Sequence, residues 1–204
     1  MYIPRNMMMN ELIQQQQFIA QFGFALLISE DLQITHLPLC LVADEGRYGT
    51  LYGHVAKANP HWKVLDNAVV KAVFNGPHSY ISPSWYANGP AVPTWNYAAV
   101  HSKGRASLLD EAGLIHSIHL LVRQYEPALL ANQELMPLDY QQKLANAIVG
   151  FKIEIDHIEG KHKLGQHKST ADQQGTAAGL ARSQHPDAKA LLAYMRQTGL
   201  GLGQ

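Results

Sequence analysis

The sequence has one cysteine, Cys40, among 204 residues. A single thiol cannot form an intramolecular disulfide, so the fold has to rest on a hydrophobic core, and a chain of this length can build one. Apolar residues flank the cysteine, which favours an inert buried thiol over a nucleophile. These features suit a reducing compartment, and we expect a cytoplasmic protein.

The sequence also lacks an excess of charge of either sign. Sixteen lysines and arginines balance sixteen aspartates and glutamates, so no global positive field attracts nucleic-acid phosphates. Binding to DNA would need a local basic patch. No apolar stretch is long enough to cross a bilayer, and the first residues lack the basic and apolar regions of a signal peptide.

Several motifs of catalysis and nucleotide binding are missing. No GxGxxG or GxxxxGK[ST] follows a predicted strand, which argues against a dinucleotide site or a P-loop. No GxSxG, cysteine–histidine pair or carboxylate pair supports covalent hydrolysis. His116 and His119 share a helix without a third ligand at matching spacing, so we predict no metal site. Residues 111–149 show no arginine-rich recognition face for direct DNA readout.

Hydrophobic periodicity predicts a mainly β fold with inserted helices. Strands are expected over residues 24–29, 33–42, 50–56, 69–74, 100–108 and 151–158, and helices over 11–22, after Asp110, over 139–149 and after Pro186. Turns and short loops link most of the strands. This pattern favours an antiparallel barrel over a doubly wound parallel sheet.

Two segments combine aromatic rings with small hydroxyl donors. Residues 74–86 carry Ser79, Tyr80, Ser82, Ser84, Trp85 and Tyr86, and residues 92–97 carry Thr94, Trp95, Asn96 and Tyr97. Rings stack on a planar heterocycle, and hydroxyls and backbone amides satisfy its polar edges. The same composition also fits a proline-pinned loop that caps a barrel, so the residues alone leave both interpretations open.

Two further segments carry histidines and lysines. Residues 53–62 contain His54, Lys57, Asn59 and His61, and residues 160–169 contain Lys161, His162, Lys163, His167 and Lys168. The second run is the one local basic cluster of the chain. It suits the neutralisation of a phosphate, although a solvated lysine loop has the same composition.

Taken in order, these segments resemble the PaiB family of FMN-binding proteins. The resemblance rests on MYIPR, GHVAKANPHW, FNGPHSYISPSWY, VPTWNYAAVH, KHKLGQHKS and GLAR, and it spans nearly the whole chain. It implies an α+β fold built on an antiparallel split β-barrel of the pyridoxamine-phosphate-oxidase-like type. It also implies a homodimer with FMN at the shared interface. On this basis we expect an FMN-binding split-barrel domain over residues 1–170 and a C-terminal helical extension, packed on the barrel, over residues 171–204.

The resemblance and the four segments together name the expected cofactor site. We predict FMN contacts from His54, Asn59, Tyr80, Ser82, Ser84, Trp85, Tyr86, Thr94, Trp95, Asn96, Lys161, Lys163 and Gln166, with no catalytic residue and no metal ligand. The late family motif usually resembles KLSQNR, whereas this chain has KLGQHK over residues 163–168. If this loop holds the phosphate, loss of a bidentate arginine and a hydroxyl weakens binding.

Three functions follow from these expectations. The family resemblance implies a negative transcriptional regulator or a flavin and redox sensor, with DNA or a regulatory protein as its partner. A flavoenzyme would instead use FMN to accept hydride from a nicotinamide or another small substrate. A third alternative is a split barrel that binds haem through one of its eleven histidines.

Overall fold

The computed structural model describes all 204 residues and divides into two compact units. We call residues 11–74 and 100–159 the barrel unit. Residues 1–10, 75–99 and 160–204 form the terminal unit, which contains both chain ends. Three long strands contribute to both units: β5 (Val69–Ile81), β6 (Thr94–Leu108) and β7 (Ile148–Lys163).

The barrel unit is built on an antiparallel sheet that closes on itself. Its strands lie in the order β2-β1-β5-β6-β7-β4-β3, with β1 at Phe24–Ser29 and β4 at Thr50–Ala56. The edge strands, β2 (Ile34–Pro38) and β3 (Cys40–Val42), are separated in sequence by Leu39 alone. Because one residue connects the two edge strands, the sheet must curl to bring its two ends together.

Period-two burial along the strands fills the barrel. Inward-facing apolar residues that are at most 1% exposed include Leu27, Leu51, Phe74, Phe151 and Ile153. The same alternation fixes the registers, with Leu27 opposite Ala72 and Leu51 opposite Ile153. A shift of one residue would turn these side chains outward, so burial itself specifies the pairing.

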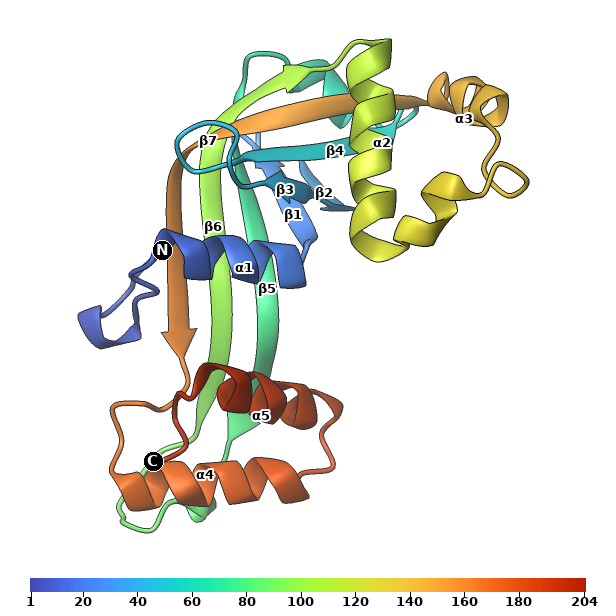
Figure 1. The fold of residues 1–204 in the computed structure, drawn as a ribbon. Coiled ribbons are helices and arrows are strands. Elements are labelled where there is room, and N and C mark those ends of the chain that lie inside the picture. The colour runs from blue at the N-terminus through green and yellow to red at the C-terminus, as the bar shows by residue number, and fades with distance from the viewer. The chain divides into compact units, whose positions relative to one another are not determined.

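Three helices belong to the barrel unit: α1 (Leu12–Gln21), α2 (Glu111–Tyr125) and α3 (Leu138–Ala145). The chain also forms short 3-10 turns there, η2 (Pro60–Val64) and η4 (Pro127–Ala131). The carboxylate of Asp110 caps α2 by accepting a hydrogen bond from the Gly113 amide at 2.8 Å. Helix α2 packs on β3, β4 and α3, as Figure 1 shows.

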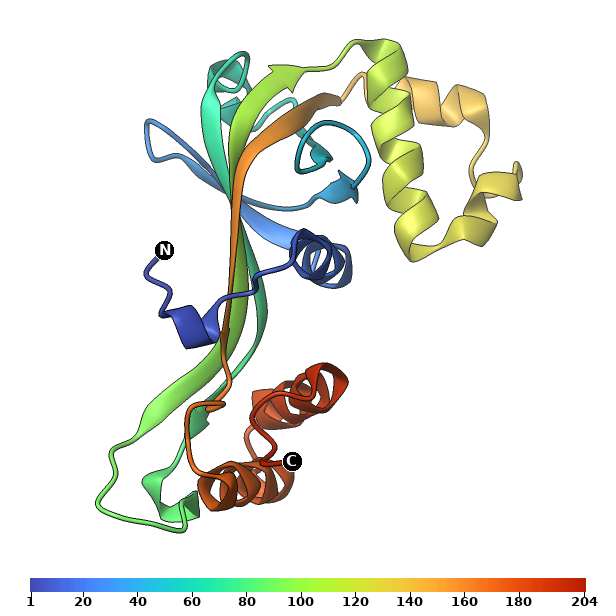
Figure 2. The same ribbon diagram turned by 60° about the vertical axis from the view of Figure 1, so that its left-hand side comes forward.

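The terminal unit joins the ends of the long strands to two C-terminal helices, α4 (Thr170–Arg182) and α5 (Pro186–Thr198). It also holds the 3-10 turns η1 (Arg5–Met7) and η3 (Pro83–Trp85). Figures 1 and 2 show α4 and α5 beside the ends of β5, β6 and β7. No helix in either unit combines the length and the apolar character that a membrane crossing requires.

The structure confirms the α+β class and the antiparallel barrel, but several predicted boundaries are wrong. Strand β5 continues past residue 74 to Ile81, through Pro77. Strand β1 pairs with β5 only as far as Phe74, so the missing amide of Pro77 interrupts no bond to β1. Strand β6 likewise begins at Thr94 rather than at residue 100.

The helix predicted over residues 139–149 ends four residues early, at Ala145. Ile148 and Val149 belong to β7 instead, and Leu144, on the helix, is 50% exposed. The apolar pair at 148 and 149 fits a helix and a strand equally well by local pattern, and pairing with β4 decides for the strand. Strand β7 also extends into the basic run, to Lys163.

Barrel closure gives a stability prediction. Leu39 has no exposed surface, so Leu39→Ala should lower the free energy of unfolding by about 2–5 kcal/mol through lost burial and the cavity that remains. Leu144→Ala, at a half-exposed position of the same unit, is the matched control and should change it by less than about 0.5 kcal/mol. Urea denaturation measures both, and equal effects would show that closure does not depend on Leu39.

Candidate functional site

A hollow lined with aromatic rings opens in the terminal unit. It has a volume of about 380 Å³ and is lined by Asn75, Gly76, His78, Trp95, Tyr97 and Ala98. The Trp95 side chain is 45% exposed, and its ring centroid lies 5.9 Å from that of His78 and 6.5 Å from that of Tyr80. An indole this exposed, beside two other rings, offers a surface for stacking.

Two lysine ammonium groups from β7 lie beside the residues of this hollow. The Nζ atom of Lys161 is 5.2 Å from the ring centroid of Tyr97 and donates a hydrogen bond to the Tyr2 carbonyl at 3.0 Å. The Nζ atom of Lys163 donates to the Thr94 hydroxyl and to the Trp95 carbonyl, both at 2.7 Å. Both lysines therefore contact residues that belong to the hollow or to its strand.

The two lysines lack a balancing negative charge. Lys161 is only 7% exposed, and neither it nor Lys163 forms an ion pair with a carboxylate. Burial, assisted by the charge of Lys161, lowers the pKa of Lys163. Buried charge without a counter-ion is costly. An anionic ligand at this place would offset that cost.

The ring surface and the cation pair together fit FMN. The hollow provides aromatic surface for a planar ring, and the two ammonium groups with the Thr94 hydroxyl provide donors for a terminal phosphate. Of the thirteen predicted contact residues, the structure brings five together here: Tyr80, Thr94, Trp95, Lys161 and Lys163.

Four predicted residues build the turn that packs on α4. Ser82 and Ser84 share a hydroxyl hydrogen bond of 2.8 Å, and Ser82 caps η3. A Cβ atom at Gly179 of α4 would lie 2.2 Å from the Trp85 ring, so the glycine allows this contact. The Nζ atom of Lys168 lies over the Tyr86 ring, 4.9 Å from the ring centroid. Trp85 is not among the residues that line the hollow.

Asn96 and Gln166 make structural contacts within the terminal unit. Asn96 is 3% exposed and lies beside Gly165. The Gln166 amide donates to the carbonyls of Asn6 and His162, at 3.0 and 2.6 Å, while its oxygen accepts from the Leu164 amide at 2.9 Å. These bonds hold the loop after β7 in place.

His54 and Asn59 lie in the barrel unit. Burial lowers the pKa of His54 on β4. The Asn59 amide donates to the Thr35 hydroxyl at 3.1 Å, and Thr35 is hydrogen-bonded to His61 Nδ1 at 2.8 Å. His61 Nε2 lies 3.0 Å from the Ser29 hydroxyl. Asn59 therefore takes part in a structural network around the β1–β2 hairpin.

The replaced residues of the family motif, Gly165, His167 and Lys168, do not supply the cation pair. Gly165 has a φ of 82°, a conformation that glycine adopts without strain and serine does not. Lys168 lies over Tyr86, and His167 is exposed. The two cations at the hollow come from the end of β7 instead.

The predicted contacts omitted four residues of this region, although the sequence analysis placed Tyr97 in an aromatic segment: Tyr2, His78, Tyr97 and His185. His78 and Tyr97 line the hollow, and the ring centroid of His185 lies 6.5 Å from that of Trp95. Tyr97 shares a strand face with Trp95, so the period of two could have found it. Tyr2 and His185 come from distant parts of the chain and leave no local signal.

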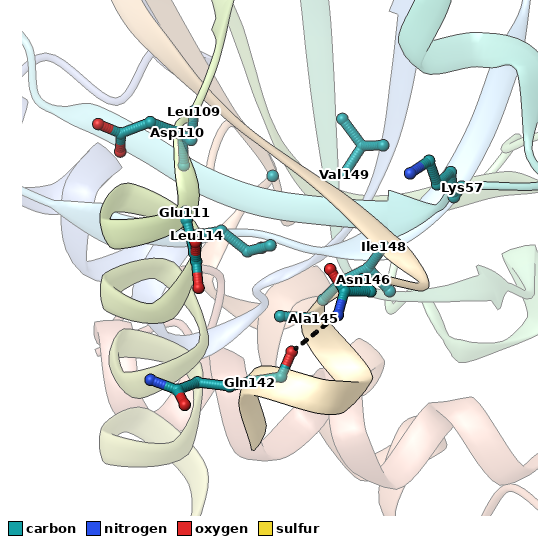
Figure 3. A pocket seen from close by; sticks show the side chains of 11 residues that line it. Lys57, Leu109, Asp110, Glu111, Leu114, Gln142, Ala145, Asn146, Ile148 and Val149 are labelled. Carbon is teal, nitrogen blue, oxygen red and sulfur yellow. Dashed lines mark hydrogen bonds between the residues drawn. The ribbon is translucent and has the colours of Figure 1, made fainter. Parts of the chain in front are cut away.

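A second hollow, of about 260 Å³, lies in the barrel unit (Figure 3). Lys57, Asp110 and Glu111 line it together with amide and aliphatic side chains, and no aromatic ring is among its lining residues. Its charges are of mixed sign. It therefore offers neither the stacking surface nor the paired cations that suit a flavin phosphate.

The buried histidine between the two lysines gives a pH prediction. Burial lowers the pKa of His162 to about 4, below the value of about 6.5 for a free imidazole. As pH falls, the imidazole of residue 162 is therefore protonated in the unfolded chain before it is protonated in the folded chain. The stability that the neutral imidazole provides, on the order of 3 kcal/mol, is lost as pH falls from about 6.5 to about 4.

Urea denaturation at pH 7, 5.5 and 4.5 measures this loss. His162→Gln is the control, because glutamine does not titrate in this range, and its stability should depend less on pH across the same interval. An identical pH profile in both proteins would contradict the assignment.

Comparison with known proteins supports FMN as the cofactor. A family model described as "Putative FMN-binding domain" matches residues 1–157. The "Protease synthase and sporulation protein PAI 2" of Bacillus subtilis strain 168 is 32% identical over 204 residues, which cover 96% of each chain. An uncharacterized protein of Emericella nidulans, AN0679, is 28% identical over 207 residues, covering 82% of each chain.

Solved structures share the fold at low sequence identity. The flavocytochrome Anf3 from Azotobacter vinelandii superposes with a TM-score of 0.62 and 15% identity, covering 80% of this chain and 73% of that chain. The FAD and heme binding protein from Mycobacterium smegmatis gives a TM-score of 0.59 and 12% identity, covering 78% and 74%. Because the family model covers most of the chain and the Bacillus relative aligns along nearly all of it, the protein belongs to the PaiB family of FMN-binding split-barrel proteins, with FMN as its cofactor.

Proposed function

We propose that the protein is a cytoplasmic FMN-dependent sensor that works as a homodimer and acts as a negative transcriptional regulator. The observation that carries the proposal is the open aromatic hollow beside two lysines that lack a counter-ion. The name of the Bacillus relative refers to protease synthesis and sporulation, which are regulated processes rather than a single reaction. The partner is DNA or a regulatory protein.

In this proposal the terminal unit binds the cofactor. Trp95, Tyr97 and His78 stack against the flavin ring, while Lys161 and Lys163 hold the phosphate with help from the Thr94 hydroxyl. When bound, FMN supplies a ring that accepts and returns electrons. The protein orients the ring, and its two ammonium groups, which protein contacts already hold in place, stabilise the phosphate with little further rearrangement.

The exposed rings support a homodimer. Tyr80 and Trp95 are 42% and 45% exposed, and their ring centroids lie 6.5 Å apart. Apolar surface that lies this close together on a soluble protein marks a binding face. A second copy that covers the hollow would bury these side chains and shield the second face of the flavin ring, giving two equivalent sites by symmetry.

Sensing requires that the two redox states of the cofactor make different contacts. The phosphate group does not change on reduction, so Lys161 and Lys163 hold the cofactor in both states. The ring does change its charge and shape, and it lies against Trp95 and His78 at the proposed subunit contact. Reduction would therefore alter the dimer where the ring meets the partner subunit.

We also propose that the chain divides near residue 170, with the FMN-binding barrel before it and a helical extension over residues 171–204. The start of α4 at Thr170 and the Ser169 cap, which accepts a hydrogen bond from the Asp172 amide at 3.2 Å, support this boundary.

The placement of the cofactor can be tested by comparing FMN with riboflavin, which lacks the phosphate. Lys161→Gln and Lys163→Gln should each weaken FMN binding by roughly 10- to 100-fold, because a charge-assisted hydrogen bond contributes about 1.5–3 kcal/mol. Riboflavin binding should change less than twofold. Trp95→Ala should weaken both ligands, because it removes stacking surface.

Flavin fluorescence quenching measures these affinities. Lys57→Gln, at an exposed lysine of the barrel unit, is the matched control and should bind FMN normally. Unchanged FMN affinity in both β7 variants would place the cofactor elsewhere on the protein.

The regulatory role is tested by sedimentation and DNA selection. The FMN-loaded protein should sediment as a dimer and enrich a defined sequence from a random DNA library, with affinity that differs at least tenfold between oxidised and dithionite-reduced cofactor. The matched control is Trp95→Ala without cofactor, whose DNA affinity should not respond to dithionite. Rapid nicotinamide oxidation without any selected DNA would favour an oxidoreductase, and a Soret band after haem addition would favour haem binding.

A further inference from the structure

The last residues of β7 alternate between two environments of the terminal unit. Lys161 and Lys163 point to the β6 side, where their Nζ atoms meet Tyr97, Thr94 and Trp95. His162, between them, must point the opposite way because successive strand side chains face opposite sides. One strand end therefore presents two cations on one face and one imidazole on the other.

His162 is anchored on that opposite face by Tyr194 of α5. Its Nε2 atom lies 2.7 Å from the Tyr194 hydroxyl, and the two residues are 7% and 6% exposed. A hydrogen bond this short between buried groups is expensive to break, because each partner would be left without a replacement from water. Neither His162 nor Tyr194 lines the aromatic hollow.

Tyr194 is itself held firmly. It lies on α5 between Leu191 and Met195, which have no exposed surface. Helix α5 starts with Pro186 in its first turn and ends at Gly199, whose φ of 69° suits a helix C-terminus. Figure 2 shows α5 alongside the ends of the long strands. The Tyr194 hydroxyl is therefore held in a fixed position, and its hydrogen bond holds His162 in turn.

From this arrangement we propose that His162 and Tyr194 are positioning residues that orient Lys161 and Lys163 toward the phosphate of FMN. The inference rests on the proposed placement of the cofactor and extends it to α5, outside the part of the chain that the family model matches. Backbone pairing and the Gln166 bond to the His162 carbonyl keep the end of β7 in the sheet, so loss of the Tyr194 bond would shift His162 and its neighbours only slightly. A small shift is enough to displace the two ammonium groups from the phosphate.

The experiment compares FMN and riboflavin binding in Tyr194→Phe, which keeps the ring and removes only the hydroxyl. FMN should bind roughly tenfold more weakly, a change that matches the loss of one hydrogen bond, whereas riboflavin affinity should change less than twofold. The ³¹P resonance of bound FMN should shift toward its position in free FMN. Tyr140→Phe, at an exposed tyrosine of α3, is the matched control and should leave all three readouts unchanged.

A second pair of variants separates positioning from folding. In His162→Gln the amide can still bond to Tyr194, so FMN affinity should stay within threefold of the parent, while His162→Leu should reproduce the Tyr194→Phe defect. Equal weakening of FMN and riboflavin in Tyr194→Phe would mean a merely structural role and would overturn the inference, as would no weakening at all. If Lys161→Gln and Lys163→Gln also leave FMN binding unchanged, the proposed cofactor placement fails as well.

Discussion

The proposed cofactor site depends on the alternation of side chains at the end of β7. Because the strand period is two, Lys161 and Lys163 share a face and His162 takes the other. The first face meets aromatic rings and carbonyl groups, and the second meets a buried tyrosine. A loop with the same residues would let each ammonium group find its own solvated position, so the extension of β7 into the basic run turns a flexible cluster into a paired donor set.

Lys161 is buried and Lys163 is partly buried, and neither forms an ion pair with a carboxylate, so an anion would complement both. The protein reduces the cost with weak acceptors: the Tyr2 carbonyl and the Tyr97 ring for Lys161, and the Thr94 hydroxyl and Trp95 carbonyl for Lys163. These groups stabilise an ammonium ion partly, but none carries a full negative charge. A phosphate therefore gains more here than at an exposed lysine pair, where water has already screened the charge.

The sequence predicted most strands of the barrel because alternation is a local pattern, but it joined β2 and β3 into one strand over residues 33–42 and so missed the break at Leu39. The hydrophobic pattern located β1 and β4 at their observed bounds, and the first part of the strand predicted over residues 33–42 pairs with β1 as β2. The errors lie where tertiary pairing decides between equal local alternatives. Ile148 and Val149 join a strand because β4 lies beside them, and Pro77 remains within β5 because β1 ends before it.

The candidate site was less predictable, because composition identifies aromatic residues but not the direction in which each one points. Trp85 and Trp95 occur in similar proline-containing segments. A glycine on α4 receives Trp85, whereas Trp95 stays exposed beside His78 and Tyr80. No local pattern carries this difference, since it depends on a helix more than ninety residues later. Tyr2 and His185 were missed for the same reason.

The departure from the family motif at residues 163–168 has a different meaning in the structure than in the sequence. At the sequence level, Gly165 and Lys168 indicate a weaker phosphate loop. In the structure the backbone at Gly165 has a positive φ, and Lys168 is directed to Tyr86. The loop's main chain is held by Gln166, whose bonds do not require the replaced side chains. If the end of β7 binds the phosphate, FMN affinity should not depend on the residues at positions 165, 167 and 168. Substitutions within the loop would then change the conformation of the loop before they changed cofactor affinity.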